Sequence, residues 1–471
     1  MRCPIVDFRQ ETVAGLAARV RSGALGAREL VQHALDRITK VNDRLNAFVA
    51  LDPEGAMTAA RALDERVARG EEVGTLAGIP IGVKDLEDAA GLATSHGSTA
   101  LPHTGPAPRD SILVARLRAQ GCVVVGKTNT PELGHYADTV NALFGSTLNP
   151  WDLAHSPGGS SGGSAAAIAA GMVPLATGSD GGGSIRIPSS ACGLSGFKPS
   201  LGRIPSGGPH APDWHHLSTR GPMARRMPDV VFALDAVIGP DPTDLRSLPM
   251  PEPSWMGAVD GAHVPMRIAW SPTLGYAPLD DEVRSVCERG VRAMEAMGAQ
   301  VDEVPCVFPE DPIRPWLTLA ASYNLRTLAH LEGTESWERI DPLLRAQLDM
   351  ARGTSTVELV RAEDRCHELN LKLVELFHDV RLLVTPTCAA APPRSGEPGL
   401  INGTPDVNWV RFTYPFNMTR SPAATVCVGF TQGGLPVGLQ LIGPQHGDLV
   451  ALRAAVALEE ALGLDPVAPI D

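Results

Sequence analysis

Closely spaced cysteines are absent from this chain: it has eight cysteines, and none forms a CxxC pair. A disulfide framework is not expected in a chain of 471 residues without an export signal. No run approaches the roughly 18 uninterrupted apolar residues of a membrane-spanning helix. The opening residues, MRCPIVDFRQ, also lack the apolar segment of a signal peptide. Together these absences predict a soluble, cytoplasmic protein.

Positive net charge is absent as well, because acidic side chains outnumber basic ones and the formal net charge is −13. An acidic chain is not attracted to nucleic acid or to an anionic membrane surface. The histidines, including the neighbours His215 and His216, do not have the spacing of metal ligands. We therefore expect a small-molecule substrate, no cofactor, no metal, no nucleic-acid or membrane partner, and a monomer or homodimer.

What the sequence does contain is an alternation of helical and strand patterns. Apolar residues recur every three or four positions through residues 1–75, where the last predicted helix covers 53–69. The apolar runs 79–83 and 122–126 are typical of buried strands, with a helical pattern between them. Helices interleaved with apolar strands predict an α/β protein, a single compact α/β/α sandwich with a central mixed, twisted sheet.

The same patterns divide one predicted domain into consecutive segments. Its segments are an N-terminal helical part (1–75), an alternating core (76–240), a mostly helical lobe (266–380) and a C-terminal return to the sheet (381–471), all within one domain over 1–471. Residues 238–265 are rich in Pro, Asp and Gly, which predicts a long connection. We expect the helical lobe to line the substrate pocket.

The feature that points to chemistry is a Gly/Ser-rich stretch from Ser156 to Ser184, which also contains helical and strand patterns. Gly181, Gly182 and Gly183 directly precede Ser184. Backbone without Cβ atoms can bring several N–H donors to one point, and such donors beside a nucleophile form an oxyanion hole. Ser184 is therefore predicted as the nucleophile, whereas the structural alternative is an ordinary glycine-rich turn.

A serine nucleophile needs a base, because the pKa of its own hydroxyl is far too high. Lys84 follows the predicted strand 79–83, so its amine is expected at a buried strand end. Burial disfavours the ammonium form and lowers the lysine pKa, which makes the neutral amine available as a proton acceptor. Asp85 would oppose this effect if it faced the amine, so we expect it to point elsewhere.

Ser160 and Ser161 lie between these groups in the sequence, in the segment PGGSSGGS. A hydroxyl both donates and accepts, so one of the two could pass a proton between Lys84 and Ser184. The alternative is that these serines only cap the small-residue helix that follows them.

The residues lie in motifs that resemble the amidase signature family over most of the chain, above all in residues 75–240. The motifs are GIPIGVKD, GKTNTPELG, the segment from NPWDLAHSPGGSSGGS through GSDGGGSIRIPSSACGLSGFKPSLGR, STRGPMAR, FNMTRSPAATV and GLPVGLQLIG. The family includes free-standing amidases, the A subunit of glutamine amidotransferase and fatty acid amide hydrolase. The resemblance implies a hydrolase that cleaves carbon–nitrogen bonds of linear amides.

The resemblance also implies roles for individual residues. Lys84 is the base, Ser160 is the relay serine after a cis Gly159–Ser160 peptide, and Ser184 forms an acyl-enzyme. The implied oxyanion hole consists of Gly181, Gly182, Gly183 and Ser184, and the implied supporting residues are Ser161, Asp180 and Arg186.

Two positions depart from the family pattern. The family usually has a larger residue in place of Gly181, so this chain is expected to have a less rigid oxyanion loop. The family usually has glycine in place of Arg420. We expect Arg420 either to narrow or charge the substrate pocket, or to form a salt bridge at the surface. An apolar acyl or aryl pocket is expected from nearby aromatic residues, namely Tyr136, Trp214, Trp316, Tyr323 and Trp409.

Amides, esters and carbamates (urethanes) share the same tetrahedral chemistry, so the sequence leaves all three open as substrates. The alternative function is the glutamine-hydrolysing A subunit of a tRNA-dependent amidotransferase. By resemblance, that subunit carries an acidic residue near the motif FTxPxN, where this chain has Val410 in NWVRFTYPFN. A valine cannot hold the glutamine amine, which favours a free-standing amidase.

One motif points to a different chemistry. Residues 121–128, GCVVVGKT, match the phosphate-binding pattern GxxxxGK[ST]. Their valines are typical of a strand, and Pro131 follows where a phosphate loop requires a helix. Nucleotide binding is therefore not predicted.

Overall fold

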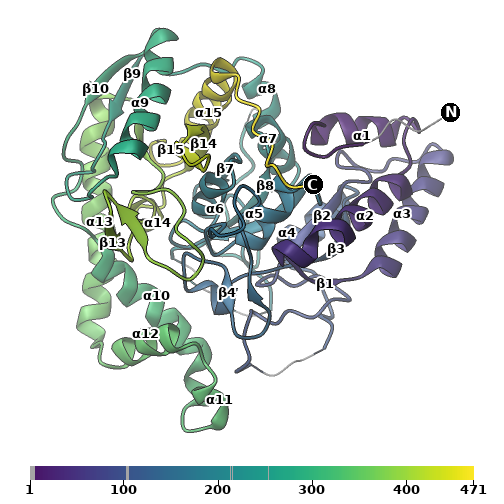
Figure 1. The fold of residues 1–471 in the computed structure, drawn as a ribbon, viewed down its shortest axis with the longest axis horizontal. Coiled ribbons are helices and arrows are strands. Elements are labelled where there is room, and N and C mark those ends of the chain that lie inside the picture. Colours follow the sequence, from purple (N-terminus) through teal and green to yellow (C-terminus); the bar gives the residue numbers. More distant parts are fainter. Residues whose placement is uncertain (1–5, 102–104, 210, 213, 215, 253) are drawn as a thin grey trace.

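Strands and helices alternate along most of the chain (Figure 1). The computed structural model describes residues 6–101, 105–209, 211–212, 214, 216–252 and 254–471, so His215 lies outside the described residues. The strands are β1 (Phe48–Leu51), β2 (Pro80–Lys84), β3 (Val123–Thr128), β4 (Val140–Asn141), β5 (Gly145–Ser146), β6 (Leu175–Asp180), β7 (Gly196–Lys198), β8 (Thr219–Ala224), β9 (Arg267–Trp270), β10 (Gln300–Glu303), β11 (Leu382–Pro386), β12 (Gly399–Ile401), β13 (Thr404–Asp406), β14 (Ala423–Phe430) and β15 (Pro436–Ile442).

The helices surround these strands. They are α1 (Val13–Arg21), α2 (Ala27–Leu45), α3 (Pro53–Ala68), α4 (Ile112–Ala119), α5 (Gly162–Ala169), α6 (Arg186–Ala191), α7 (Met227–Asp235), α8 (Trp255–Val259), α9 (Asp281–Ala296), α10 (Ile313–Leu328), α11 (Glu335–Glu338), α12 (Pro342–Arg352), α13 (Thr356–Asp379), α14 (Pro415–Met418) and α15 (Asp448–Leu462), with 3-10 turns η1 (Glu132–Gly134) and η2 (Ala329–Leu331). In the described part of the chain, no helix has both the length and the apolar content that a membrane span requires.

The described strands form two main sheets that meet edge to edge. One has five strands in the order β1-β3-β2-β6-β8, and the other has six in the order β10-β9-β11-β15-β14-β7. A bridge between Ser195 and Ala224 joins them where β7 approaches β8. Strand β2 pairs in parallel with β3 and β6, whereas β14 and β15 pair antiparallel. The sheet is therefore mixed, and the α/β class that the sequence predicts is confirmed.

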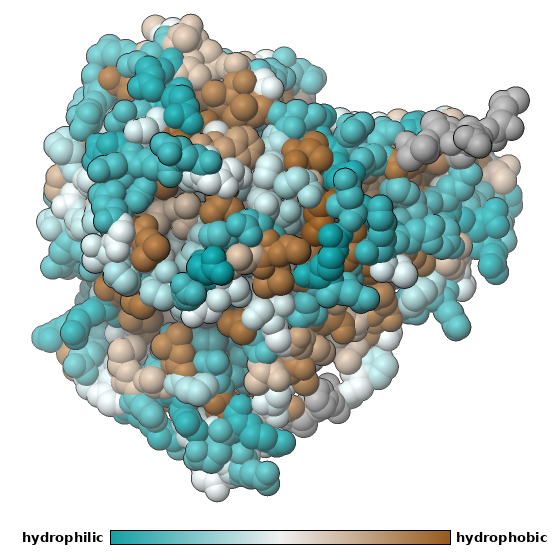
Figure 2. Space-filling view, in the orientation of Figure 1, coloured by the Kyte–Doolittle hydropathy of each residue, from teal (hydrophilic) through white to brown (hydrophobic). Residues whose placement is uncertain are grey.

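The N-terminal segment follows the predicted helices with one exception. Helix α2 buries residues at helical spacing along one face, and the outer surface over α2 and α3 is mostly hydrophilic (Figure 2). The expectation of helices alone missed β1, an edge strand that pairs antiparallel with β3. Asn46 ends α2 in a left-handed conformation and Pro53 starts α3, so only a short segment between them is free to extend. Such a short apolar run has no periodicity that distinguishes strand from helix.

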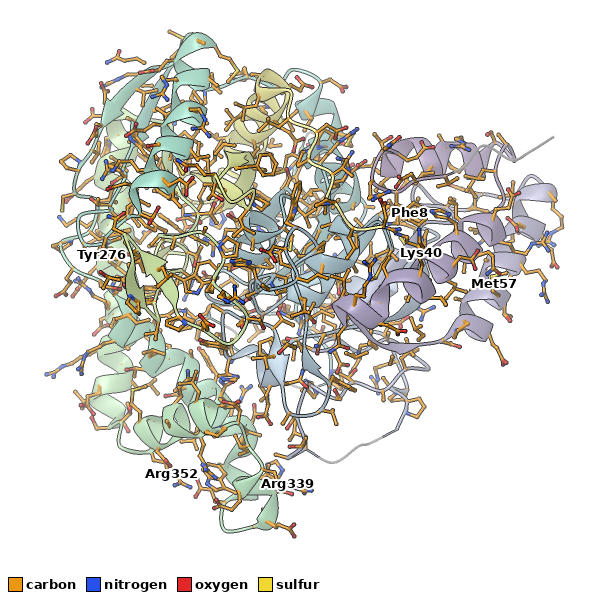
Figure 3. All side chains as sticks on the ribbon, in the orientation of Figure 1. Phe8, Lys40, Met57, Tyr276, Arg339 and Arg352 are labelled. Carbon is orange, nitrogen blue, oxygen red and sulfur yellow. The ribbon has the colours of Figure 1, made fainter. Side chains whose placement is uncertain are left out.

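The helical lobe carries a small hydrophobic core of its own. Its buried residues, with Ala100 from the neighbouring loop, are Leu328, Leu331, Trp337, Ile340, Leu344 and Leu348. Arg339 and Arg352 mark the outer end of this lobe (Figure 3), where the Arg352 guanidinium lies 4.6 Å from the centre of the Trp337 ring. Helices α10 and α12 pack against each other and face the sheet edge at which β2 and β6 end.

The parallel strands β2 and β6 bring the candidate residues together. Lys84 is the last residue of β2 and Asp180 is the last residue of β6, so both lie at the carboxyl edge of the sheet. Helices α5 and α6 begin beside this edge. In open α/β sheets, ligands bind outside the carboxyl ends of the strands.

Candidate active site

The Lys84 amine lies in a completely buried position surrounded by serine hydroxyls. Its Nζ is 2.7 Å from Ser160 Oγ, 2.9 Å from Ser161 Oγ and 3.0 Å from Ser179 Oγ. Burial lowers the pKa of Lys84 from 10.5 to about 7. The neutral amine is therefore well populated near pH 7, where its lone pair can accept a proton from a hydroxyl.

Asp85 is turned away from this amine, as expected from the sequence. Its carboxylate lies 3.3 Å from Lys127 Nζ and accepts a hydrogen bond from the Ser95 N–H. Lys127 belongs to the phosphate-loop-like segment, which forms the buried strand β3. The lysine of that motif is therefore part of a buried ion pair.

Ser160 and Ser161 are held at the start of α5. The Gly159–Ser160 peptide is cis. Ser161 occupies the N-cap position, but its hydroxyl contacts Lys84 and makes no capping hydrogen bond. The Ser161 N–H donates to the Ser184 carbonyl at 3.3 Å, which ties the start of α5 to the glycine loop.

The glycine loop is packed against large side chains that leave no room for a Cβ atom. A Cβ on Gly181 would overlap the Trp214 ring, and one on Gly182 would overlap the Trp316 ring. The Trp316 indole N–H also donates to the Gly181 carbonyl at 3.0 Å. Gly183 has a φ of +133°, which favours glycine. The space beside Gly181 is thus filled by Trp214 in place of a larger side chain at position 181.

A buried ion pair joins the residues on either side of the glycine loop. Arg186 Nε and Nη2 donate to the two Asp180 carboxylate oxygens at 2.9 and 2.8 Å, and both side chains are fully buried. Burial alone would raise the pKa of Asp180, but the charge and hydrogen bonds of Arg186 outweigh it and lower the pKa to about 2. Asn417 Nδ2 donates to the Asp180 carbonyl at 2.7 Å, so the C-terminal motif also fixes this loop.

Ser184 lies between two cavities and is half-buried. The polar cavity, of about 150 Å³, is lined by Leu86, Glu87, His96, Leu101, Leu133, Gly134, Ser160, Ser179, Gly181, Ser184, Trp214, Ser218, Arg220, Asn324 and Thr327. The apolar cavity, of about 220 Å³, is lined by Gly134, His135, Tyr136, Ala137, Gly159, Gly182, Ser184, Ile187, Trp214, Trp316, Leu317, Leu343, Gln347, Val407, Asn408, Val410 and Tyr414. Gly134, Ser184 and Trp214 line both.

The structure brings Ser160 and Ser184 to one cavity wall without joining them directly. Within the described residues, no hydrogen bond links the two hydroxyls. Contacts of this kind are often long in unliganded enzymes and tighten when substrate binds.

The aromatic residues expected at the pocket fall into two groups. Tyr136, Trp214 and Trp316 line the apolar cavity. Trp409 is 4% exposed, packs against Gly399 and lines a different, much smaller void. Tyr323 lies on α10 beside His216, with the two ring centres 6.4 Å apart.

Arg420 lies at the protein surface, where its Nη2 is 3.4 Å from His216 Nδ1. Its φ of +60° is in the left-handed region, which favours glycine at this position. Its side-chain contact is thus with a histidine, and no carboxylate among the described residues forms the salt bridge expected as one alternative.

Sequence reasoning missed three residues at the site. Ser179 contacts Lys84, the Thr413 hydroxyl donates to the Gly182 carbonyl, and Asn324 lines the polar cavity. Ser179 stands next to Asp180 in the same Gly/Ser stretch, and Thr413 stands in the quoted segment NWVRFTYPFN, so both had a signal. Asn324 lies within α10, and nothing in the helical pattern distinguishes it. In the portion of the chain covered here, no three His, Cys, Asp or Glu side chains gather as metal ligands.

Comparison with known proteins identifies relatives along nearly the whole chain. The family model described as Amidase matches residues 29–451. An acylamidase from Rhodococcus erythropolis is 37% identical over 455 residues, covering 94% of each protein. The A subunit of the glutamyl-tRNA(Gln) amidotransferase from Salinispora arenicola is 34% identical over 490 residues, covering 98% of this chain and 99% of that protein.

Solved structures show the same fold. A bacterial aryl acylamidase of the amidase signature family superimposes with a TM-score of 0.89 at 29% identity, covering 96% of both chains. A 6-aminohexanoate cyclic dimer hydrolase superimposes with a TM-score of 0.88 at 28% identity, covering 98% of both chains.

Proposed function

Because this chain belongs to the amidase family and is a hydrolase of amide bonds, we propose that it is a free-standing serine amidase with Ser184 as nucleophile. The contact of 2.7 Å between Lys84 Nζ and Ser160 Oγ carries the proposal. It provides a base of suitable pKa for a hydroxyl that lines the same cavity as Ser184.

In the first half-reaction, Ser184 Oγ attacks the amide carbonyl carbon and passes its proton to Ser160 Oγ, whose own proton moves to Lys84 Nζ. The backbone N–H groups of residues 181–184 stabilise the negative charge on the carbonyl oxygen. The C–N bond then breaks, and Lys84 returns a proton through Ser160 to the departing nitrogen. An amine leaves, and the acyl group remains on Ser184.

In the second half-reaction, water takes the place of the amine. Its proton follows the same route to Lys84, its oxygen attacks the acyl carbon, and the bond to Ser184 Oγ breaks. Ser184 regains a proton from Ser160, and the products are a carboxylic acid and the free enzyme. The triad of Lys84, Ser160 and Ser184 therefore acts twice, first to release the amine and then to release the carboxylic acid.

The proposed substrates are aryl or alkyl amides. The apolar cavity beside Ser184 supports an apolar acyl group, and relatives include an acylamidase and an aryl acylamidase. Esters and carbamates belong to the same proposal, because they differ only in the leaving group or in the atom next to the carbonyl. We further propose that residues 1–471 act as one domain on a small molecule, in the cytoplasm, as a monomer or homodimer.

The second candidate is a glutamine-hydrolysing A subunit, which the identity of 34% to such a protein favours. A glutamine side chain would place its ammonium group on the acyl side of Ser184. Among the described residues that line the apolar cavity, none is acidic, and Val410 contributes an apolar wall. Release of ammonia from free glutamine would favour this candidate.

The test is turnover of chromogenic amides, esters and carbamates by the wild type, Ser184→Ala and Lys84→Met. We expect at least one amide to be hydrolysed by the wild type and both variants to lose more than about a thousandfold in kcat. Mass spectrometry should detect an acyl adduct on the wild type and none on Ser184→Ala. Retained turnover in Ser184→Ala would show that another group is the nucleophile.

A further inference from the structure

The two cavities beside Ser184 differ in chemistry and share Trp214 in their walls. The apolar cavity is lined mainly by Tyr136, Ile187, Trp316, Leu317, Leu343, Val407 and Val410. The polar cavity contains Ser160 and Ser179, both in contact with Lys84, together with charged and amide side chains. An amide that reacts at Ser184 must therefore place its two halves in unlike surroundings.

The position of Ser160 sets the orientation. In the proposed mechanism the departing nitrogen takes its proton from Ser160, so the amine must leave on the side where Ser160 is accessible. Ser160 lines the polar cavity, and the apolar cavity is bordered by Gly159 instead. The amine half therefore faces the polar cavity and the acyl half faces the apolar one.

Asn324 offers an unused donor in the polar cavity. Its side chain is 2% exposed, and its Oδ1 accepts a hydrogen bond from the Trp214 indole N–H at 2.7 Å. An indole N–H can only donate, so the atom that faces it must be the amide oxygen, and Nδ2 must point the other way. This Nδ2 has no hydrogen-bond partner among the described residues.

A buried amide donor without a partner destabilises the protein, so its retention at a cavity wall points to a ligand. Arg220 lines the same cavity and lies with its Nε 3.3 Å from Glu87 Oε1. The ion pair balances the two charges, and the guanidinium has further N–H groups to offer. Glu87 Oε1 also makes no hydrogen bond among the described residues, but the Arg220 charge lies beside it and compensates its negative charge.

Resting on the proposed function, we propose that the leaving amine of the substrate carries a carbonyl or carboxylate oxygen, which accepts a hydrogen bond from Asn324 Nδ2. An apolar acyl group fills the other cavity. The substrate class is therefore an apolar N-acyl derivative of an amino acid, an amino amide or a similar amine, and not a simple alkylamide.

Three N-benzoyl amides of matched size test this assignment, with isopentylamine, β-alaninamide and β-alanine as the amines. We expect kcat/KM of the wild type to be about tenfold higher for the two amines that carry a carbonyl group. Asn324→Leu should bring these ratios to about one. Asn324→Asp keeps an acceptor for Trp214 but loses the donor, so it should abolish the preference for β-alaninamide and disfavour β-alanine. The two carbonyl-bearing substrates distinguish a neutral from an anionic acceptor.

Gln347→Leu is the control, because it also replaces a side-chain amide by leucine, but in the apolar cavity. It should leave the ratios among the amines unchanged, whatever its effect on overall rate. Equal kcat/KM for the three substrates in the wild type, or ratios that persist in both Asn324 variants, would refute the subsite while the amidase function stands. If the wild type hydrolysed chromogenic amides but none of these three, the subsite would be refuted and the amidase function would stand.

Discussion

Lys84 combines a basic side chain with a position where charge is disfavoured. No water-exposed surface remains around its amine, and three serine hydroxyls surround it. The protonated form is destabilised by burial, which lowers the pKa to about 7. The charge on Glu87 raises this pKa and the charge on Arg220 lowers it, so the pair on the cavity wall also affects the protonation of Lys84.

The pH dependence of the reaction should report this pKa. Only neutral Lys84 accepts a proton, so kcat/KM should rise as the pH increases through about 7 and level off above it. Glu87→Gln should move the rising part of the pH–rate profile to lower pH, because the Glu87 charge raises the pKa of Lys84. Arg220→Gln should move it to higher pH, because the Arg220 charge lowers that pKa. A pH–rate profile from 5 to 10 measures all three. A limb that stays in place in both variants would mean that another group titrates.

At the scale of elements, the glycine loop of residues 181–183 is held by β6, α6 and the segment around Thr413 and Asn417. Their link is the ion pair between Asp180 and Arg186, which is inaccessible to water. Removing one partner of such a pair leaves an uncompensated buried charge, which costs about 3–5 kcal/mol.

Asp180→Asn should therefore lower the free energy of unfolding by about 3 kcal/mol, measured in denaturant at neutral pH. The pKa of Asp180 is lowered from 3.8 to about 2, so this contribution is complete above pH 4 and is lost as the pH falls toward 2. The difference between wild type and variant should shrink over the same range. Asp302→Asn is the control, because Asp302 and its partner Arg267 both lie at the surface. This variant should produce no resolvable change in the free energy of unfolding.

Most residues of the candidate site could be predicted from the sequence, because they stand in recognisable motifs. Lys84 and Ser184 were selected because a lysine after an apolar strand and a serine after three glycines occur together in motifs that resemble the amidase signature family, and their catalytic roles stay predictions. Trp214 was expected at the pocket because it is aromatic, but its hydrogen bond to Asn324 was not predictable. The place of Asn324 depends on how α10, distant in sequence, docks on the site. The strand β1 was missed because its four residues are too few to show a period.

At the scale of the whole molecule, the helical lobe is attached to the core beside the active site. Asp341 at the start of α12 lies 3.3 Å from His135 Nε2, and its N–H donates to Glu132 Oε2 at 2.7 Å. The hydrogen bond from His135 lowers the pKa of Asp341 to about 2. Asp341 also caps α12 by accepting from the N–H groups of Leu343 and Leu344.

Asp341→Ala should loosen the lobe without unfolding the sheet. Hydrogen exchange should become faster in α10–α12 and stay unchanged in β2 and β6, because the lost side-chain contacts join the lobe to His135 and cap α12, and none involves those strands. KM should rise more than kcat falls, since the lobe supplies walls of both cavities. Asp349→Ala removes the partner of Arg352 on the same helix and should not change exchange at the cavities. Equal exchange in the two variants would argue against Asp341 as the attachment point.

Trp214 lines both cavities beside Ser184, one polar and one apolar. This arrangement affects how the enzyme can acquire new substrate specificities. Under the proposed orientation, mutations at Asn324 in the polar cavity act on the amine product, and mutations near residues 407–410 in the apolar cavity act on the acid product. Neither set changes Lys84, Ser160 or Ser184. A gene for this enzyme can therefore acquire a new preference for one product through a series of active intermediates. The preference for the amine half and the preference for the acyl half can therefore be evolved separately in the laboratory. The two sets of mutations can then be combined by recombination.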